Sequence, residues 1–156
     1  MQGTDEQPGI VPRAIEEIYS LKQRMEGNGH YKVTFECYMV QLYVDSLIDC
    51  FVSTSTSQQH LQIKPVKLEI REDPSNGIIN IHNTTILPIT TLKEALAAFE
   101  RGARSRKVFS TELNDVSSRS HMIFTIVIST INRETGQRTK SKVSFVDLAG
   151  SERYDK

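Results

Sequence analysis

The sequence has no excess charge, few cysteines and no long apolar run. Its 156 residues contain 19 Lys and Arg and 19 Asp and Glu, so the formal net charge is zero. Binding of nucleic acid by bulk electrostatics needs a basic excess, and this balance argues against it. No apolar stretch approaches the roughly 20 residues that cross a bilayer. The polar residues 1–12 also lack the apolar core of a signal peptide. We therefore expect a cytosolic chain that binds neither nucleic acid nor membrane.

The two cysteines, Cys37 and Cys50, are too few for a disulfide framework or a metal cluster. We expect both thiols to be reduced, and Cys37 to pack in the core of a strand. An apolar content of 38% and a charged content of 24% are typical of a globular chain. The length corresponds to one domain or to a piece of a larger one.

Apolar spacing organises the first third of the chain. A helix is predicted from the apolar residues of 14–25, with Pro12 in its first turn. A long strand follows at residues 31–44. Apolar residues occupy both the odd-numbered and the even-numbered positions of this strand, which face opposite sides. The polar Gln41 fits less well among the odd-numbered ones. This pattern predicts a strand inside a sheet that is covered on both sides. A short helix is predicted at residues 46–51.

A capping box marks the start of the second helix. The Thr91 hydroxyl can accept the amide hydrogen of Glu94 while the Glu94 carboxylate reaches back toward Thr91. An apolar stripe behind this box predicts a helix over residues 92–101, and Gly102 is expected to weaken its end.

Four further segments are strand-like. Residues 66–70 and 78–82 flank a turn, and residues 122–131 and 143–148 flank another, so that the second pair forms an antiparallel hairpin. Strands that alternate with helices predict a layered α/β sheet with at least one antiparallel pair.

Two polar segments border that second hairpin. NDVSSRSH at residues 114–121 comes directly before the first strand, and DLAGSE at 147–152 ends and follows the second. The start of one antiparallel strand lies beside the end of the other. The two polar segments are therefore expected to be neighbours in space.

The chemistry of these two segments suits a magnesium-bound phosphate. The Asp147 carboxylate can hold a water of a magnesium shell, and Gly150 lets its N–H approach a terminal phosphate. The hydroxyls of Ser117 and Ser118 can supply another magnesium ligand and a contact to the same phosphate.

Arg119 and Glu152 can form an ion pair that latches the two segments together. Other interpretations remain open, because a lone DxxG is a weak signal and a serine-rich SSRS stretch is often a solvated turn or a phosphorylation site. His121 alone is more often a hydrogen-bonded structural residue than a catalyst. A group of four basic residues is most simply a solvated helix end: Arg101, Arg104, Arg106 and Lys107.

These motifs carry a resemblance to a known family. NDVSSRSH at 114–121 resembles the switch I motif NxxSSRSH of the kinesin motor domain, and VDLAGSE at 146–152 resembles its switch II motif. Residues 9–19 are similar to the PGIxPRA segment of a motor helix, and residues 77–107 to a strand–helix region. Within that region ILPITT, at 86–91, resembles calmodulin-regulated members of the kinesin-14 group.

The resemblance implies a mixed central sheet flanked by helices, an incomplete P-loop NTPase (kinesin motor) fold, with ATP and Mg²⁺ as cofactors. Ser118 is implied as the magnesium-shell hydroxyl and Asp147 as a residue that faces the metal, partly through water. Ser117 is implied to lie beside the γ-phosphate and the attacking water. Asn114 and the Gly150 amide are implied to contact the nucleotide.

The family also implies a catalytic latch and a partner. Arg119 and Glu152 would form the switch salt bridge that positions the attacking water. The microtubule (tubulin) would be the partner, which implies a location in the cytoplasm on the cytoskeleton. Two segments depart from the family pattern: YVDS at 43–46 replaces Tyr-Asn-Glu, and the loop 71–77, where kinesins contact tubulin, is not basic.

The chain contains no GxxxxGK[ST] string, the loop that cradles phosphates in this family. We therefore expect residues 1–156 to be a partial motor domain, with the phosphate-binding loop upstream and the microtubule-binding helices downstream. The isolated chain is expected to be marginally stable and inactive as an ATPase, with dimerisation left to segments outside it.

Two functions remain open at this point. One is a fragment of an ATP-dependent microtubule motor. The other is a truncated, non-catalytic motor-fold protein that binds tubulin or another partner. A GTPase is disfavoured because the guanine-reading NKxD string is absent.

Overall fold

The computed structural model describes residues 1–4, 6–52, 67–74, 77–112 and 120–149. These residues form two helices and seven strands: α1 (Ile10–Glu26), β1 (Tyr31–Tyr43), β2 (Ser46–Asp49), β3 (Glu69–Glu72), β4 (Ile79–His82), β5 (Leu87–Pro88), α2 (Leu92–Glu112), β6 (Ser120–Asn132) and β7 (Arg138–Asp147). Neither of these two helices is long and apolar enough to cross a membrane.

The main sheet is built around β1. Its strand order is β2-β1-β6-β7, and the short β5 also pairs with β1. β6 runs along the whole of β1, where Tyr43 lies opposite Ser120. β7 continues the sheet, with Asp147 opposite Met122. All these pairs are antiparallel, and the predicted hairpin over residues 122–148 is confirmed.

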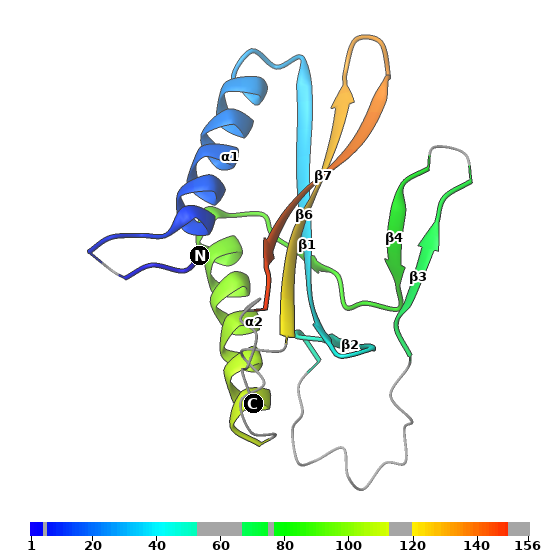
Figure 1. Ribbon diagram of the computed structural model, residues 1–156. Coiled ribbons are helices and arrows are strands. Elements are labelled where there is room, and N and C mark those ends of the chain that lie inside the picture. Colours follow the sequence, from blue (N-terminus) through cyan, green and yellow to red (C-terminus); the bar gives the residue numbers. More distant parts are fainter. Residues whose placement is uncertain (5, 53–66, 75–76, 113–119, 150–156) are drawn as a thin grey trace, which may run out of the picture.

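Both helices cover the same face of this sheet (Figure 1). The aromatic residues of the core lie between them and the strands. Tyr19 of α1 meets Phe35 of β1 edge to face, with 5.1 Å between ring centroids. Phe99 of α2 meets Phe124 of β6 at 5.3 Å. The Tyr19 hydroxyl donates a 2.7 Å hydrogen bond to the carbonyl oxygen of Ile89, just after β5. The core therefore joins α1, α2 and three strands.

The opposite face of the sheet carries a smaller apolar cluster, in which Val127 of β6 packs with Leu68, the residue before β3. The β3–β4 hairpin lies on this side (Figure 1). Lys142 of β7 reaches it, because its ammonium donates to the carbonyl oxygen of Ile79 and to Asn80 Oδ1. The prediction that the long strand is apolar on both faces is confirmed.

The prediction of a helix at residues 46–51 is wrong. β2 instead folds back on β1, with Ser46 opposite Tyr43. The reversal occurs at Val44, which has a φ of 52°. Glycine is favoured at such a position and a β-branched residue is rare there. A short apolar segment reads equally as helix or strand in the sequence, and here pairing with β1 decides the outcome.

The second helix starts as predicted and ends later. The Glu94 amide donates to Thr91 Oγ1 at 3.2 Å, and the Thr91 amide donates to Glu94 Oε2 at 3.2 Å, which confirms the capping box. The helix does not weaken at Gly102 but continues to residue 112. Gly102 is buried, and a Cβ built on it would lie 2.2 Å from Met39 Sδ. Close packing explains this glycine, whereas a helix end does not.

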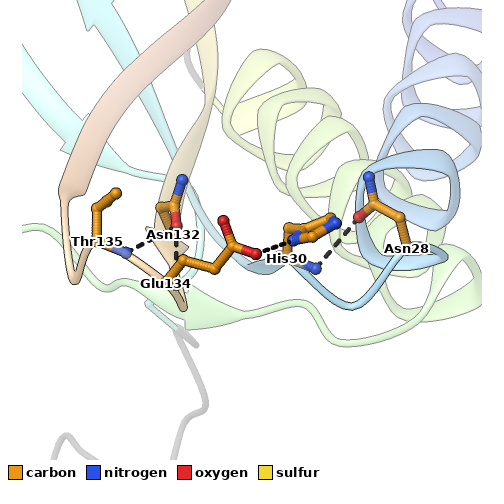
Figure 2. Close-up of polar contacts among 5 residues, drawn as sticks. All are labelled: Asn28, His30, Asn132, Glu134 and Thr135. Carbon is orange, nitrogen blue, oxygen red and sulfur yellow. Dashed lines mark hydrogen bonds and ion pairs between the residues drawn. The ribbon is translucent and has the colours of Figure 1, made fainter.

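A polar network closes the end of the sheet that lies away from Asp147 (Figure 2). His30 Nδ1, in the loop between α1 and β1, lies 2.6 Å from Glu134 Oε1 in the β6–β7 turn. Asn132 Oδ1 accepts the amide hydrogens of Glu134 and Thr135, and Asn28 Oδ1 accepts that of His30. The network fixes two turns together, so that it has a structural role in holding the strand register.

Candidate functional site

The sequence nominates seven site residues, and the structure describes one of them, Asp147. The other six lie outside the described residues: Asn114, Ser117, Ser118, Arg119, Gly150 and Glu152. The geometry of the site is therefore built from Asp147 and the described residues around it.

The strands that carry the two polar segments end side by side. β6 begins at Ser120, and Met122 on β6 lies opposite Asp147, the last residue of β7. The backbone N–H of Ala149 donates a 3.0 Å hydrogen bond to Nδ1 of His121. His121 therefore ties the end of β7 to the start of β6, in agreement with a structural role for this histidine.

Asp147 has a cationic partner that the sequence analysis missed. Its carboxylate forms a close ion pair with the guanidinium of Arg106 in α2. The same guanidinium donates to the carbonyl oxygen of Ser120 at 3.3 Å. The Arg106 side chain is 17% exposed and that of Asp147 39% exposed. Arg106 thus connects α2 to the ends of both β6 and β7.

This arrangement corrects the interpretation of the basic cluster as a solvated helix end. Arg106 lies inside α2 and is largely buried. Arg101 donates to the carbonyl oxygen of Phe51, so that it anchors the segment after β2. Arg104 remains solvated, 3.8 Å from Glu100 one turn earlier. The helix continues beyond the cluster, because Gly102 does not end it, and this continuation places Arg106 against the sheet, whereas Arg101 and Arg104 stay exposed.

Three residues at this end of the sheet have buried side-chain polar atoms without hydrogen-bond partners among the described residues. Gln41 of β1 is fully buried, and neither its amide nitrogen nor its oxygen has a hydrogen-bond partner among the described residues. The Ser120 hydroxyl and Arg106 Nε are likewise buried without a hydrogen-bond partner among the described residues. Gln41 lies opposite Met122, which lies opposite Asp147, so the three side chains share one face of the sheet. We call Gln41, Arg106, Ser120 and Asp147 the polar cluster.

Cys50 has a buried thiol, and one residue of the polar cluster, Arg106, affects its pKa. Burial raises its pKa to about 12, the charge of Asp49 raises it as well, and the Arg106 guanidinium opposes both effects. Burial also raises the pKa of Cys37 to about 12. Both thiols are free and Cys37 is buried, as predicted, and Cys50 is buried as well; neither has the lowered pKa of a reactive cysteine.

The polar cluster fits a magnesium ion held mainly through water and substrate oxygens. The described residues contain no group of three or more His, Cys, Asp or Glu side chains that could enclose a metal. Mg²⁺ commonly keeps several waters and takes only one or two protein carboxylates, with phosphate oxygens completing its shell. A single carboxylate at a strand end beside a buried hydroxyl agrees with that mode of binding.

Comparison with known proteins identifies the family to which this chain belongs. The sequence profile of the kinesin motor domain matches residues 1–156, the whole chain. The chain therefore belongs to the kinesin motor-domain family, and the resemblance of its two polar segments to the kinesin switches is confirmed at the level of the family.

The relatives include members of the kinesin-14 group. The chain is 39% identical over 154 residues to the kinesin-like protein KIN-14E of Arabidopsis thaliana. This match covers 99% of this chain and 11% of that protein. It is 38% identical to KIN-14I of Oryza sativa subsp. japonica, over 99% of this chain and 12% of that protein. The chain thus spans about a ninth of the length of these relatives.

Solved structures confirm the predicted α/β kinesin motor fold. A fast kinesin superposes with a TM-score of 0.84 at 26% identity, over 99% of this chain and 41% of that one. The motor domain of KAR3, a Saccharomyces cerevisiae kinesin-related protein, superposes with a TM-score of 0.75 at 26% identity, over 99% and 44%.

Proposed function

We propose that this chain is part of an ATP-dependent microtubule motor, in which hydrolysis of ATP is coupled to movement along microtubules. Membership of the kinesin motor-domain family supports this function. The observation that carries it is the pairing of Met122 with Asp147, because it brings the strand ends of the two switch-like segments together.

In this proposal the two segments hold Mg·ATP between them. Ser118 contributes a hydroxyl to the magnesium shell, and Asp147 faces the metal partly through water. Gly150 and Asn114 contact the nucleotide, and Ser117 lies beside the γ-phosphate and the attacking water. When bound, magnesium neutralises charge on the terminal phosphates. Because Asp147 is paired with Arg106 in this structure, it must turn from the guanidinium to take up this role.

Arg119 and Glu152 form the latch that positions the attacking water. In the sequence Arg119 directly precedes β6 and Glu152 follows β7, and the start of β6 and the residues after β7 are joined by the hydrogen bond from Ala149 to His121. Closing the latch orders both segments around the γ-phosphate, and opening it releases them after hydrolysis.

Tubulin is the proposed partner, and the cytoskeleton the proposed location. The β3–β4 hairpin lies on the side of the main sheet opposite the helices, as Figure 1 shows. Glu72 at the end of β3 and Asp73 directly after it would repel an acidic surface. We therefore assign this hairpin a smaller share of the contact than a basic loop would supply. Dimerisation would depend on segments outside residues 1–156.

The latch is tested with Arg119→Ala and Glu152→Ala, in the natural protein that carries residues 1–156. Each variant should keep its affinity for ATP, because the phosphate and metal contacts remain. Each should lower microtubule-stimulated kcat by on the order of a hundredfold, the usual cost of a misplaced reacting group. Steady-state ATPase assays and binding of a fluorescent ATP analogue measure the two quantities separately.

Arg133→Ala is the matched control, since Arg133 is an exposed arginine of the β6–β7 turn. It should behave as wild type. Unchanged turnover in both latch variants would remove the latch from the mechanism. Microtubule binding without any nucleotide binding by the wild type would instead support the alternative function, a non-catalytic module that binds tubulin.

A further inference from the structure

Gln41 is a buried amide with an unusual environment. It occupies a core position of β1, in line with Met39 and Cys37, yet it is polar and fully buried. Both of its amide atoms lack partners among the described residues. Buried side-chain amides are nearly always hydrogen-bonded, because an unpaired buried dipole loses its hydration without compensation. We therefore expect the Gln41 side-chain amide to have a hydrogen-bond partner in another conformational state of the molecule.

Arg106 is a donor with spare capacity on the same face of the sheet, because its ion-pair partner Asp147 shares that face with Gln41. Its guanidinium donates to Asp147 and to the Ser120 carbonyl oxygen, but its Nε–H has no partner within the described part of the chain. The amide of Cys50 donates to the carbonyl oxygen of Met39, two residues before Gln41. The guanidinium and the Gln41 amide are thus on the same face of the sheet, near the same strand end.

The charges explain why a second partner for Arg106 matters. A largely buried guanidinium that loses its carboxylate is left uncompensated, which opposes any movement of Asp147 away from it. An amide oxygen is an uncharged acceptor. It can receive the guanidinium N–H without competing with Asp147 as strongly as a carboxylate would. A neutral acceptor at Gln41 therefore lowers the cost of releasing Asp147.

We propose that Gln41 is a positioning residue for Asp147: its side-chain oxygen accepts a hydrogen bond from the Arg106 guanidinium when Asp147 turns from Arg106 toward nucleotide-bound magnesium. Arg106 thus exchanges one partner for another while it keeps its bond to the Ser120 carbonyl. The exchange couples the end of β7 to the centre of β1. The role of the exchange in the motor rests on the proposed function, whereas the exchange itself is a property of the polar cluster.

A double-mutant cycle tests the exchange without nucleotide. Gln41→Leu replaces the unpaired amide by an apolar side chain of similar size, so that in the wild-type background it should leave the melting temperature unchanged or raise it. In an Asp147→Ala background Arg106 depends on Gln41, and the same substitution should lower the melting temperature by about 3 °C. Gln137→Leu, at an exposed glutamine, is the control and should have no effect in either background.

Equal effects of Gln41→Leu in the two backgrounds would overturn the proposal, since they would show that Gln41 contributes packing alone. The second measurement is the Mg²⁺ concentration that gives half-saturation with a fluorescent ATP analogue. Gln41→Leu should raise it roughly tenfold, because Asp147 stays with Arg106. An unchanged Mg²⁺ requirement would overturn the role in the nucleotide site. A wild-type protein that binds no Mg·ATP, with the thermal coupling intact, would overturn the proposed function and leave the exchange standing.

Discussion

At the scale of single residues, Gly102 shows how packing overrides local preference. A glycine inside a helix usually costs about 1 kcal/mol relative to alanine. Gly102→Ala should nevertheless destabilise the protein by about 1–2 kcal/mol, because the added Cβ would overlap Met39 in a filled core. That Cβ would also lie 3.2 Å from Phe51 Cε1. Chemical denaturation measures the change. Ser105→Ala, in the same helix, should be neutral or slightly stabilising, and a stabilised Gly102→Ala would contradict the packing argument.

The residues of the site were only partly predictable from the sequence. The position of Asp147 at a strand end follows from the apolar run before it. Its partner Arg106 lies 41 positions away in the sequence, and only the packing of α2 on the sheet brings the two together. Gln41 gave a weak signal, since it was the one polar residue at a core parity of its strand. Its relation to Arg106 depends on the register of three strands, which no local pattern encodes.

At the scale of elements, the start of α2 depends on ionised Glu94. Its carboxylate accepts from the Thr90 hydroxyl and from the amides of Thr90 and Thr91. The hydrogen bond from the Thr90 hydroxyl, and then the two backbone bonds, lower the pKa of Glu94 below its ordinary value of 4.5. Folding thus favours the charged form. The resulting stabilisation is complete above pH 4.5 and is lost as the pH falls through the lowered pKa.

Glu94→Gln should therefore flatten the acid limb of the stability curve. Below the pKa of folded Glu94 the variant and the wild type should converge, and at neutral pH the wild type should be the more stable. Denaturant midpoints measured from pH 3 to pH 7 test this expectation. Glu100→Gln is the control, because Glu100 is exposed and lies 3.8 Å from the solvated Arg104. A constant difference between Glu94→Gln and wild type at every pH would contradict the titration.

Long elements were predictable and short ones were not. β1 has 13 residues rich in β-branched and aromatic side chains, and a segment of that length identifies a strand without reference to its neighbours. β2 has four residues, and the sequence analysis took it for a helix. Its conformation is set by the reversal at Val44 and by pairing with β1. β5 has only two residues and exists because it pairs with Glu36 and Cys37 of β1.

At the scale of the whole molecule, Lys142 joins the main sheet to the β3–β4 hairpin. A two-stranded hairpin is marginally stable by itself, so that β3–β4 depends on such contacts. Lys142→Met removes the two hydrogen bonds to Ile79 and Asn80 and keeps the length of the side chain. If the two hydrogen bonds contribute about 1 kcal/mol to the free energy of opening the hairpin, their loss should make amide hydrogen exchange in β3 and β4 roughly fivefold faster. Exchange in β1 and β6 should not change, because their pairing does not involve this lysine.

Lys140→Met provides the comparison for that experiment, since Lys140 is an exposed lysine two residues earlier in β7. It should leave exchange in the hairpin unaltered. If Lys142→Met also leaves β3 and β4 protected, the apolar contact of Leu68 with Val127 holds the hairpin without help from the lysine. Faster exchange limited to the hairpin would show that a surface lysine sets how firmly the proposed tubulin-facing element is attached. The attachment then runs through β7, the strand that ends at Asp147, and so connects the hairpin mechanically to the polar cluster.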